Sequence, residues 1–163
     1  MCSFKISVVS PDHIPTHVHA VDADNHLRFH FSFASPTARH LDTLSKKRIS
    51  TKLIQDLLDD VVGNIGRHRQ DWIKYHLGLG FGYNNKAVMI KPNSSHPDGY
   101  LVRISRYSHF GISHIPKNKR EQYVKNQTRI VKEGFKNGKM VLLLSDGRTI
   151  CLTPGLHIDD AFK

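Results

Sequence analysis

The sequence predicts an α+β protein, built from small antiparallel sheets that are each packed by one amphipathic helix and divided between two halves. Three observations favour this fold class. Residues 26–33 alternate strictly between polar and apolar side chains, as in a half-buried strand. Residues 53–73 instead carry apolar side chains at helical spacing. Near the C-terminus, two apolar runs flank Ser145-Asp146-Gly147, which is typical of a hairpin turn.

The composition predicts a folded, cytoplasmic protein with an anionic partner. Of its 163 residues, 39% are hydrophobic and 23% are charged, which allows a packed core. No apolar run fits a membrane span or a signal peptide, and two cysteines argue against a disulfide scaffold. The net charge is +10, and residues 101–163 hold twelve Lys or Arg against five Asp or Glu. Such a basic half points first to nucleic acid. The alternative is that the charge only confers solubility.

The N-terminal half opens with a short strand, residues 5–9, and continues into a histidine-rich hairpin. Pro15 biases its neighbour towards extended backbone, and the chain reads as a strand from His17. The turn chemistry of residues 22–25 centres the hairpin. A one-residue slip would turn the apolar set outward, so burial fixes the register. This register pairs His17 with His30, His19 with Arg28 and Val21 with His26, and buries Leu27, Phe29, Phe31 and Phe33.

Two kinds of chemistry are open to the imidazoles on the polar face of this hairpin. Paired histidines titrate near neutrality and can act as acid and base in RNA cleavage. His17 and His30 are the predicted catalytic pair, with His19 helping and Arg28 holding the phosphate. Alternatively, His13, His17 and His19 would hold a divalent transition metal and leave positions open for water or substrate. Histidines on strands also fill ordinary polar positions, and that interpretation stays open.

One long helix is predicted over residues 51–76. Ser50 is a good N-cap, and the apolar stripe runs unbroken through Gly63 and Gly66. The glycine-rich segment 78–82 then lacks the Lys-Ser/Thr ending of a phosphate-binding loop, so we interpret it as a helix stop and linker.

The linker predicts two domains, 1–77 and 78–163, joined near residues 77–85. Two strands are expected in the second domain, at 86–91 and 100–106.

A second helix is predicted over residues 117–133, between Pro116 and Gly134. Its apolar stripe is thin and the rest of its surface is strongly basic. The alternative to a binding surface is an ordinary solvated helix face. The predicted nucleic-acid-binding residues are Lys117, Lys119, Arg120, Lys125, Arg129 and Lys132, which would meet phosphates, and Tyr123, which would stack on a base.

The N-terminal half resembles a group of small bacterial proteins, domain-of-unknown-function family 4160. The residues that carry the resemblance are the run His13-Ile14-Pro15-Thr16-His17-Val18-His19, a hairpin, and a helix that ends near Trp72. The family has a second proline where Thr16 stands. Residues 138–150 also resemble the opening hairpin of domain-of-unknown-function family 2442, which is often encoded beside it. The resemblance implies a bacterial or phage setting of the toxin–antitoxin or defence type, and it supplies no established chemistry.

Three functions follow as hypotheses. The first is a protein that binds nucleic acid or a nucleoprotein complex in a bacterial or phage conflict system. The second is a nuclease that depends on its histidines or on a bound metal. The third is an inhibitor that covers the nucleic-acid-binding surface of a cognate protein partner. No membrane partner is expected.

Overall fold

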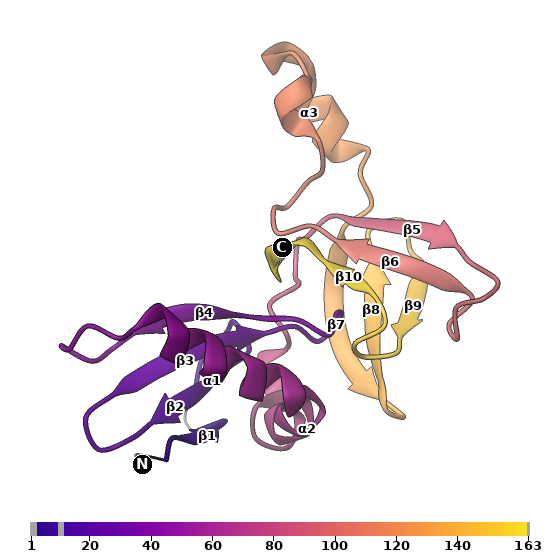
Figure 1. The fold of residues 1–163 in the computed structure, drawn as a ribbon. Coiled ribbons are helices and arrows are strands. Elements are labelled where there is room, and N and C mark those ends of the chain that lie inside the picture. The colour runs from indigo at the N-terminus through magenta and orange to yellow at the C-terminus, as the bar shows by residue number, and fades with distance from the viewer. Residues whose placement is uncertain (1–2, 10–11, 163) are drawn as a thin grey trace. The chain divides into compact units, whose positions relative to one another are not determined.

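The computed structural model describes residues 3–9 and 12–162 of the chain. They divide into two compact units, one reaching Gly82 and including Phe162, the other running from Tyr83 to Ala161. The predicted α+β class is confirmed, because three α-helices accompany three small sheets in the described ranges (Figure 1). None of the described helices is long and apolar enough to span a membrane.

The division between the units falls a few residues after the expected boundary at 77. Residues 78–82 belong with the first unit because they pack into its core. The indole Nε1 of Trp72 donates a hydrogen bond of 3.0 Å to the Gly80 carbonyl, and the ring centroids of Phe81 and Phe33 lie 4.3 Å apart.

The first unit contains a four-stranded antiparallel sheet in the order β1-β2-β3-β4, with its helices on one face (Figure 1). The predicted hairpin register is confirmed, and the predicted apolar set is fully buried. Strand β4 extends the sheet beyond that hairpin. The strands are β1 (Lys5–Ser7), β2 (His17–Val21), β3 (His26–Phe31) and β4 (Ala38–Thr43).

The single helix predicted over 51–76 is wrong, because the structure has two helices there: α1 (Thr51–Gly63) and α2 (Ile65–His76). Ser50 caps α1 as expected by accepting from the Leu53 amide. The break falls at Asn64, whose φ of −109° and ψ of 14° are not helical. Its side-chain amide donates to the backbone carbonyl and the carboxylate of Asp60. A glycine beforehand and an asparagine that bonds to the preceding turn together end the helix.

The second unit holds two three-stranded sheets in the orders β10-β6-β5 and β7-β8-β9 (Figure 1). Backbone hydrogen bonds between residues 85–88 and 128–130 join them. The hairpin predicted around Gly147 is confirmed. The core is made of alternate residues of these strands, which are β5 (Val88–Pro92), β6 (Tyr100–Ile104), β7 (Ile130–Lys136), β8 (Lys139–Leu144), β9 (Thr149–Leu152) and β10 (Ile158–Asp159).

The helix predicted over 117–133 is also wrong in its second half. Helix α3 (Lys117–Lys125) is short, and residues 130–136 form β7, with Gly134 inside the strand. The reason is the turn at Asn137 and Gly138, whose φ angles of 53° and 76° let β7 fold back on β8. Arg129 and Lys132 therefore do not share a helix face with the other predicted basic residues. Helix α3 buries no residue and projects from the unit instead of packing on a sheet (Figure 1).

Candidate functional site

Two histidines and an aspartate converge at the start of the first unit, and we call Asp12, His17 and His19 the Asp12 cluster. Strand β2 places the two histidines on the same side, because alternate residues of a strand face the same way. The segment before β2 brings Asp12 against them. His17 Nε2 lies 2.8 Å from Asp12 Oδ1, and His19 Nε2 lies 3.4 Å from Asp12 Oδ2. One ligand atom from each side chain lies within 4.8 Å of the other two.

Three of the four facing atoms of this cluster have no hydrogen-bond partner among the described residues. They are Asp12 Oδ2, His17 Nε2 and His19 Nε2, all of which are buried. The fourth, Asp12 Oδ1, accepts from the backbone amide of His13 at 3.0 Å. The side chains of Asp12, His17 and His19 are 4%, 0% and 13% exposed. Burying polar atoms without a partner costs free energy, and such atoms are rare in folded proteins. The cluster therefore needs a physical explanation.

The tautomer of His17 makes its contact with Asp12 unfavourable. Its Nδ1 lies 2.7 Å from the Pro15 carbonyl, which only accepts, so Nδ1 carries the proton. Burial lowers the pKa of His17, which keeps the ring neutral near neutrality. Nε2 therefore presents a lone pair to a carboxylate oxygen, and the two atoms repel each other. A cation between them would turn this repulsion into two attractive contacts.

The spacing of these atoms fits a divalent transition metal. Zinc binds imidazole nitrogen and carboxylate oxygen at about 2.0–2.2 Å, so two such donors on one ion lie about 3–3.5 Å apart. The distances of 2.8 and 3.4 Å from Asp12 to the two histidines are close to this range. Three protein ligands leave further positions for water or substrate, as in catalytic sites.

Outer contacts hold both rings in the orientation that metal ligands need. A ligating histidine usually donates its other ring N–H to a carbonyl or another acceptor. The Pro15 carbonyl fills this role for His17. For His19, Nδ1 lies 2.6 Å from His26 Nε2, so one ring donates to the other. His19 can donate there while its Nε2 stays free for the cation.

The structure brings together two of the three predicted metal ligands, and the third residue that joins them is not the predicted one. Both His17 and His19 face Asp12, which the sequence analysis did not include. His13 stands at the rim with its side chain 65% exposed, and its Nδ1 lies 3.3 Å from Asp12 Oδ1. The available signal was a carboxylate directly before the histidine run, since mixed imidazole and carboxylate sets are common for zinc and iron.

The predicted catalytic pair is less favoured by its surroundings. His30 lies opposite His17 in the sheet, as predicted, and is buried. Burial, and then the charge of Arg39, lower the pKa of His30 to about 3. A ring that stays neutral down to this pH cannot supply a proton near neutrality. Arg28 lies opposite His19 and donates to Asp42.

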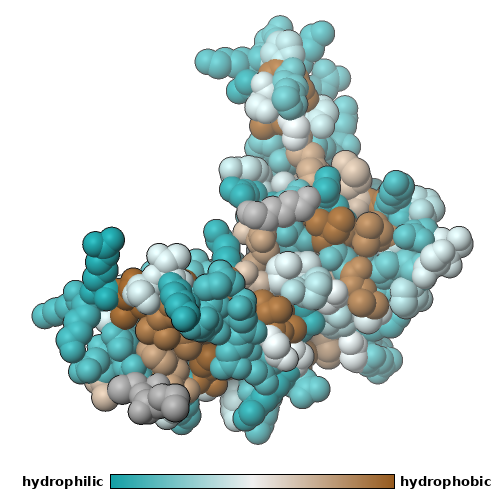
Figure 2. Space-filling view, in the orientation of Figure 1, coloured by the Kyte–Doolittle hydropathy of each residue, from teal (hydrophilic) through white to brown (hydrophobic). Residues whose placement is uncertain are grey.

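Five of the seven predicted nucleic-acid-binding residues lie on a projection of the second unit, residues 107–127, which we call the basic arm. Its surface is largely hydrophilic, at the top of the view in Figure 2. The side-chain amide of Gln127 joins the two ends of the arm. It donates to the Phe110 carbonyl and accepts from the Phe110 amide, both at 3.0 Å. Tyr123 is 36% exposed on α3. The arm carries Lys117, Lys119, Arg120 and Lys125, whereas Arg129 lies after it and Lys132 on β7.

The second unit also contains two histidines and an aspartate in contact, and we call His96, Asp98 and His157 the Asp98 cluster. Here the polar atoms are hydrogen-bonded. His157 Nδ1 accepts from the Val102 amide, and its Nε2 donates to Asp98 at 2.8 Å. His96 Nδ1 accepts from the Asp98 amide, and its Nε2 donates to the Leu156 carbonyl. The lone pair of each ring is therefore occupied.

The carboxylate of Asp98 is satisfied as well. It accepts from Lys139 at 2.8 Å, and from the amide and hydroxyl of Thr153 at 2.7 Å each. Burial alone would raise the pKa of Asp98, but these donors together lower it well below its usual range. The Asp98 cluster therefore joins segments of the second unit by hydrogen bonds. Its ring nitrogens and its carboxylate oxygens are all engaged and are not free to ligate a metal.

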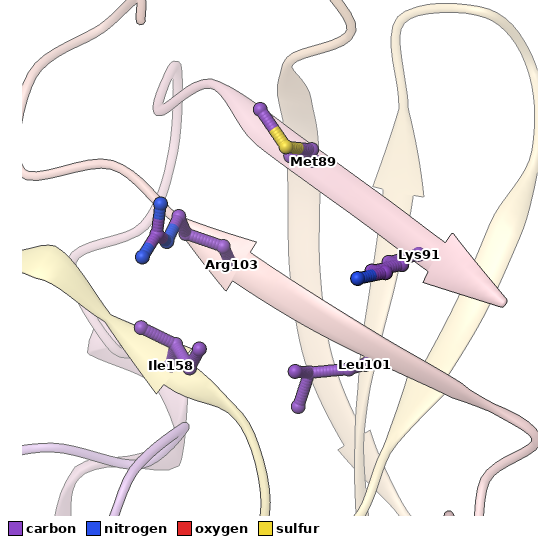
Figure 3. A pocket seen from close by; sticks show the side chains of 5 residues that line it. All are labelled: Met89, Lys91, Leu101, Arg103 and Ile158. Carbon is purple, nitrogen blue, oxygen red and sulfur yellow. The ribbon is translucent and has the colours of Figure 1, made fainter. Parts of the chain in front are cut away.

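A shallow cavity of about 320 Å³ lies on one face of the β10-β6-β5 sheet. Figure 3 shows Lys91 and Arg103 beside an apolar lining. No imidazole or carboxylate from the described residues lines it. Arg103 is also engaged, with Nε 3.6 Å from Asp160. The cavity therefore offers a ligand mainly apolar and cationic contacts.

No family model, curated protein or solved structure matches this chain. The resemblance to the two families of unknown function therefore stays a prediction.

Proposed function

We propose that the first unit binds one divalent transition-metal ion through the Asp12 cluster and uses it to hydrolyse phosphodiester bonds of nucleic acid. The observation that carries this proposal is the convergence of three buried atoms that could ligate a metal and that have no hydrogen-bond partner among the described residues. Among the described residues, the Asp98 cluster is the other group of this composition, and its atoms are satisfied.

The chain's own residues have distinct parts in this proposal. Asp12, His17 and His19 hold the ion, while the Pro15 carbonyl and His26 keep the two rings oriented. An ion in such a site lowers the pKa of a bound water and polarises a phosphoryl oxygen. The exposed His13 lies at the rim, with its Nδ1 3.3 Å from Asp12 Oδ1. Nucleic acid as substrate is supported by the net charge of +10.

The test is cleavage of labelled RNA and DNA by protein loaded with zinc, cobalt or iron(II), with and without EDTA. We expect cleavage that EDTA abolishes. Asp12→Asn should lower the rate of cleavage by more than about 100-fold. This exceeds the loss of activity expected when a residue that only orients a metal ligand is removed. Asp24→Asn, in an exposed turn of the same hairpin, is the matched control. Cleavage that persists in Asp12→Asn, or a wild-type protein that binds metal without cleaving, would refute the nuclease.

A second candidate function is the binding of nucleic acid, or of a nucleoprotein, by the basic arm without bond cleavage. The observation that favours it is a helix with no buried residue and an excess of cations. Lys125 pairs with Glu121, and the Arg120 Nε donates to the Ile115 carbonyl. Lys117 and Lys119 form no ion pair within the described part of the chain, and are free to meet phosphates.

Gel-shift affinity over a range of salt tests the arm. Binding through phosphates weakens steeply as salt rises. Lys117→Ala and Lys119→Ala should each reduce the slope of log affinity against log salt by about one. Lys46→Ala and Lys52→Ala, exposed in the first unit, serve as controls for loss of general charge. An affinity that does not change with salt, or that responds equally to all four variants, would refute binding by the arm.

A further inference from the structure

A guanidinium group stands beside the Asp12 cluster and is held there by a partner that the sequence analysis did not identify. Arg28 lies directly opposite His19 in the β2–β3 pairing, and opposite Asp42 in the β3–β4 pairing. Side chains that face each other across neighbouring strands are close enough to interact. Arg28 therefore lies between the cluster on one side and Asp42 on the other.

The contacts of Arg28 leave some of its N–H donors unused. Its Nε donates to Asp42 Oδ1 at 2.8 Å, and its NH2 donates to Asp42 Oδ2, which makes a two-pronged ion pair. The third nitrogen, NH1, lies 3.5 Å from Nε2 of the exposed His13 at the rim. A guanidinium has five N–H donors in a fixed fork, so donors on NH1 remain for a further acceptor.

The location suits a ligand rather than a purely structural pair. The Arg28 and Asp42 side chains are 18% and 38% exposed, so the group is reachable from solvent. Because Asp42 already fixes the fork, little conformational freedom is lost when NH1 binds an acceptor. His13 lies at the same rim, where its Nε2 accepts from NH1 of Arg28.

We infer that the Asp12 cluster binds its substrate through a phosphate group, which is held between the metal and NH1 of Arg28. This inference rests on the proposed metal centre and names the chemistry of its ligand. A tetrahedral oxyanion can place one oxygen on the ion and another on Arg28. Asp42 is then a positioning residue, which holds the guanidinium without touching the ligand.

The test uses full-length protein loaded with cobalt(II), whose visible spectrum reports on its ligands, and inorganic phosphate as the probe. Phosphate should change the spectrum of the wild-type protein. Arg28→Gln should weaken phosphate binding by about tenfold or more, since a hydrogen bond to a charged group is lost. Its affinity for cobalt should stay within about twofold, which also shows that the variant folds. Acetate in place of phosphate shows whether any anion suffices.

Two further variants and one control complete the design. Arg28→Lys keeps the charge but loses the fork, and should bind phosphate at an intermediate strength. Asp42→Asn should weaken phosphate binding severalfold without weakening cobalt binding. Arg148→Gln is the matched control, because the Nε and NH2 of Arg148 also donate to one carboxylate, through Oδ2 of Asp146 in the second unit. Its phosphate affinity should equal that of the wild type.

The two proposals fail in different ways. A wild-type protein that does not bind cobalt would overturn the metal centre and this inference together. Full cobalt binding with a phosphate affinity that Arg28→Gln leaves unchanged would overturn this inference alone. Equal binding of acetate and phosphate would overturn the assignment of phosphate as the ligand group.

Discussion

Each unit of the molecule brings two histidines and an aspartate together, but the two clusters use their nitrogen and oxygen atoms differently. In the Asp98 cluster both rings accept from a backbone amide through Nδ1 and donate through Nε2. In the Asp12 cluster His17 donates through Nδ1, and its Nε2 faces a carboxylate. Composition and proximity are the same, so the hydrogen-bond inventory is what distinguishes a candidate metal centre from a structural tie.

The largest expected difference between the clusters is in metal affinity. His17→Ala should weaken zinc or cobalt binding by more than about 100-fold, because a direct ligand is lost. His157→Ala should leave the affinity unchanged, because its lone pair is already occupied. Competition against a chelator of known affinity measures both variants. Equal losses in the two variants would remove the distinction drawn between the clusters.

In the metal-free protein, a substitution in the Asp98 cluster should change the free energy of unfolding more than a substitution in the Asp12 cluster. Asp98→Asn should destabilise the protein by about 3 kcal/mol, because an amide group would face donors from Lys139 and Thr153. Asp12→Asn should change stability by less than about 0.5 kcal/mol or increase it, since its amide can donate to the bare Nε2 of His17.

Urea unfolding of the metal-free protein measures both effects. Trp72, the one tryptophan of the chain, reports on the first unit through its fluorescence, and circular dichroism reports on the whole chain. A large loss of stability in Asp12→Asn would mean that its carboxylate is already satisfied without a cation.

Asp98 should contribute to the pH dependence of stability below about pH 4. The pKa of Asp98 is lowered in the folded protein, so its contribution is present above its unfolded value, about 4. That contribution should be lost as the pH falls from about 4 towards the folded pKa. Urea unfolding at several pH values should show this slope in the wild type and a weaker slope in Asp98→Asn. The same slope in both proteins would contradict the assignment.

The smallest expected effect is on the ring protons. Nitrogen NMR should find His157 and His96 protonated at Nε2, and adding zinc should not shift their signals. His17 should carry its proton at Nδ1, and its Nε2 signal should shift on zinc addition. A zinc-dependent shift of His157 would place metal at the wrong cluster.

How far the sequence predicts this structure depends on the range of the interactions. The β2–β3 register follows from local alternation and a local turn, so it was predictable residue by residue. The end of α1 depends on one asparagine side chain, and the loss of a helix after Lys125 depends on a turn at Asn137. In both places the prediction followed the helical spacing of the apolar residues and not these local signals.

The candidate site was predicted only in part for a similar reason. His17 and His19 belong to one short run, but Asp12 joins them only once the chain before β2 has folded back. Asp42 reaches Arg28 through a third strand that the sequence pattern did not indicate. The residues that donate to the Asp98 carboxylate lie 41 to 59 positions away, so no local pattern contains them.

The measurement that tests the central claim most directly is the number of metal ions bound per chain. Purified protein, dialysed against zinc and then against metal-free buffer, should retain one ion per chain by elemental analysis. Binding should also change the fluorescence of Trp72, whose ring lies 6.1 Å from that of His17. Asp12→Ala should retain none, and Asp98→Asn should retain one. A wild-type chain that holds no metal, or an Asp12→Ala chain that keeps its ion, would contradict the account.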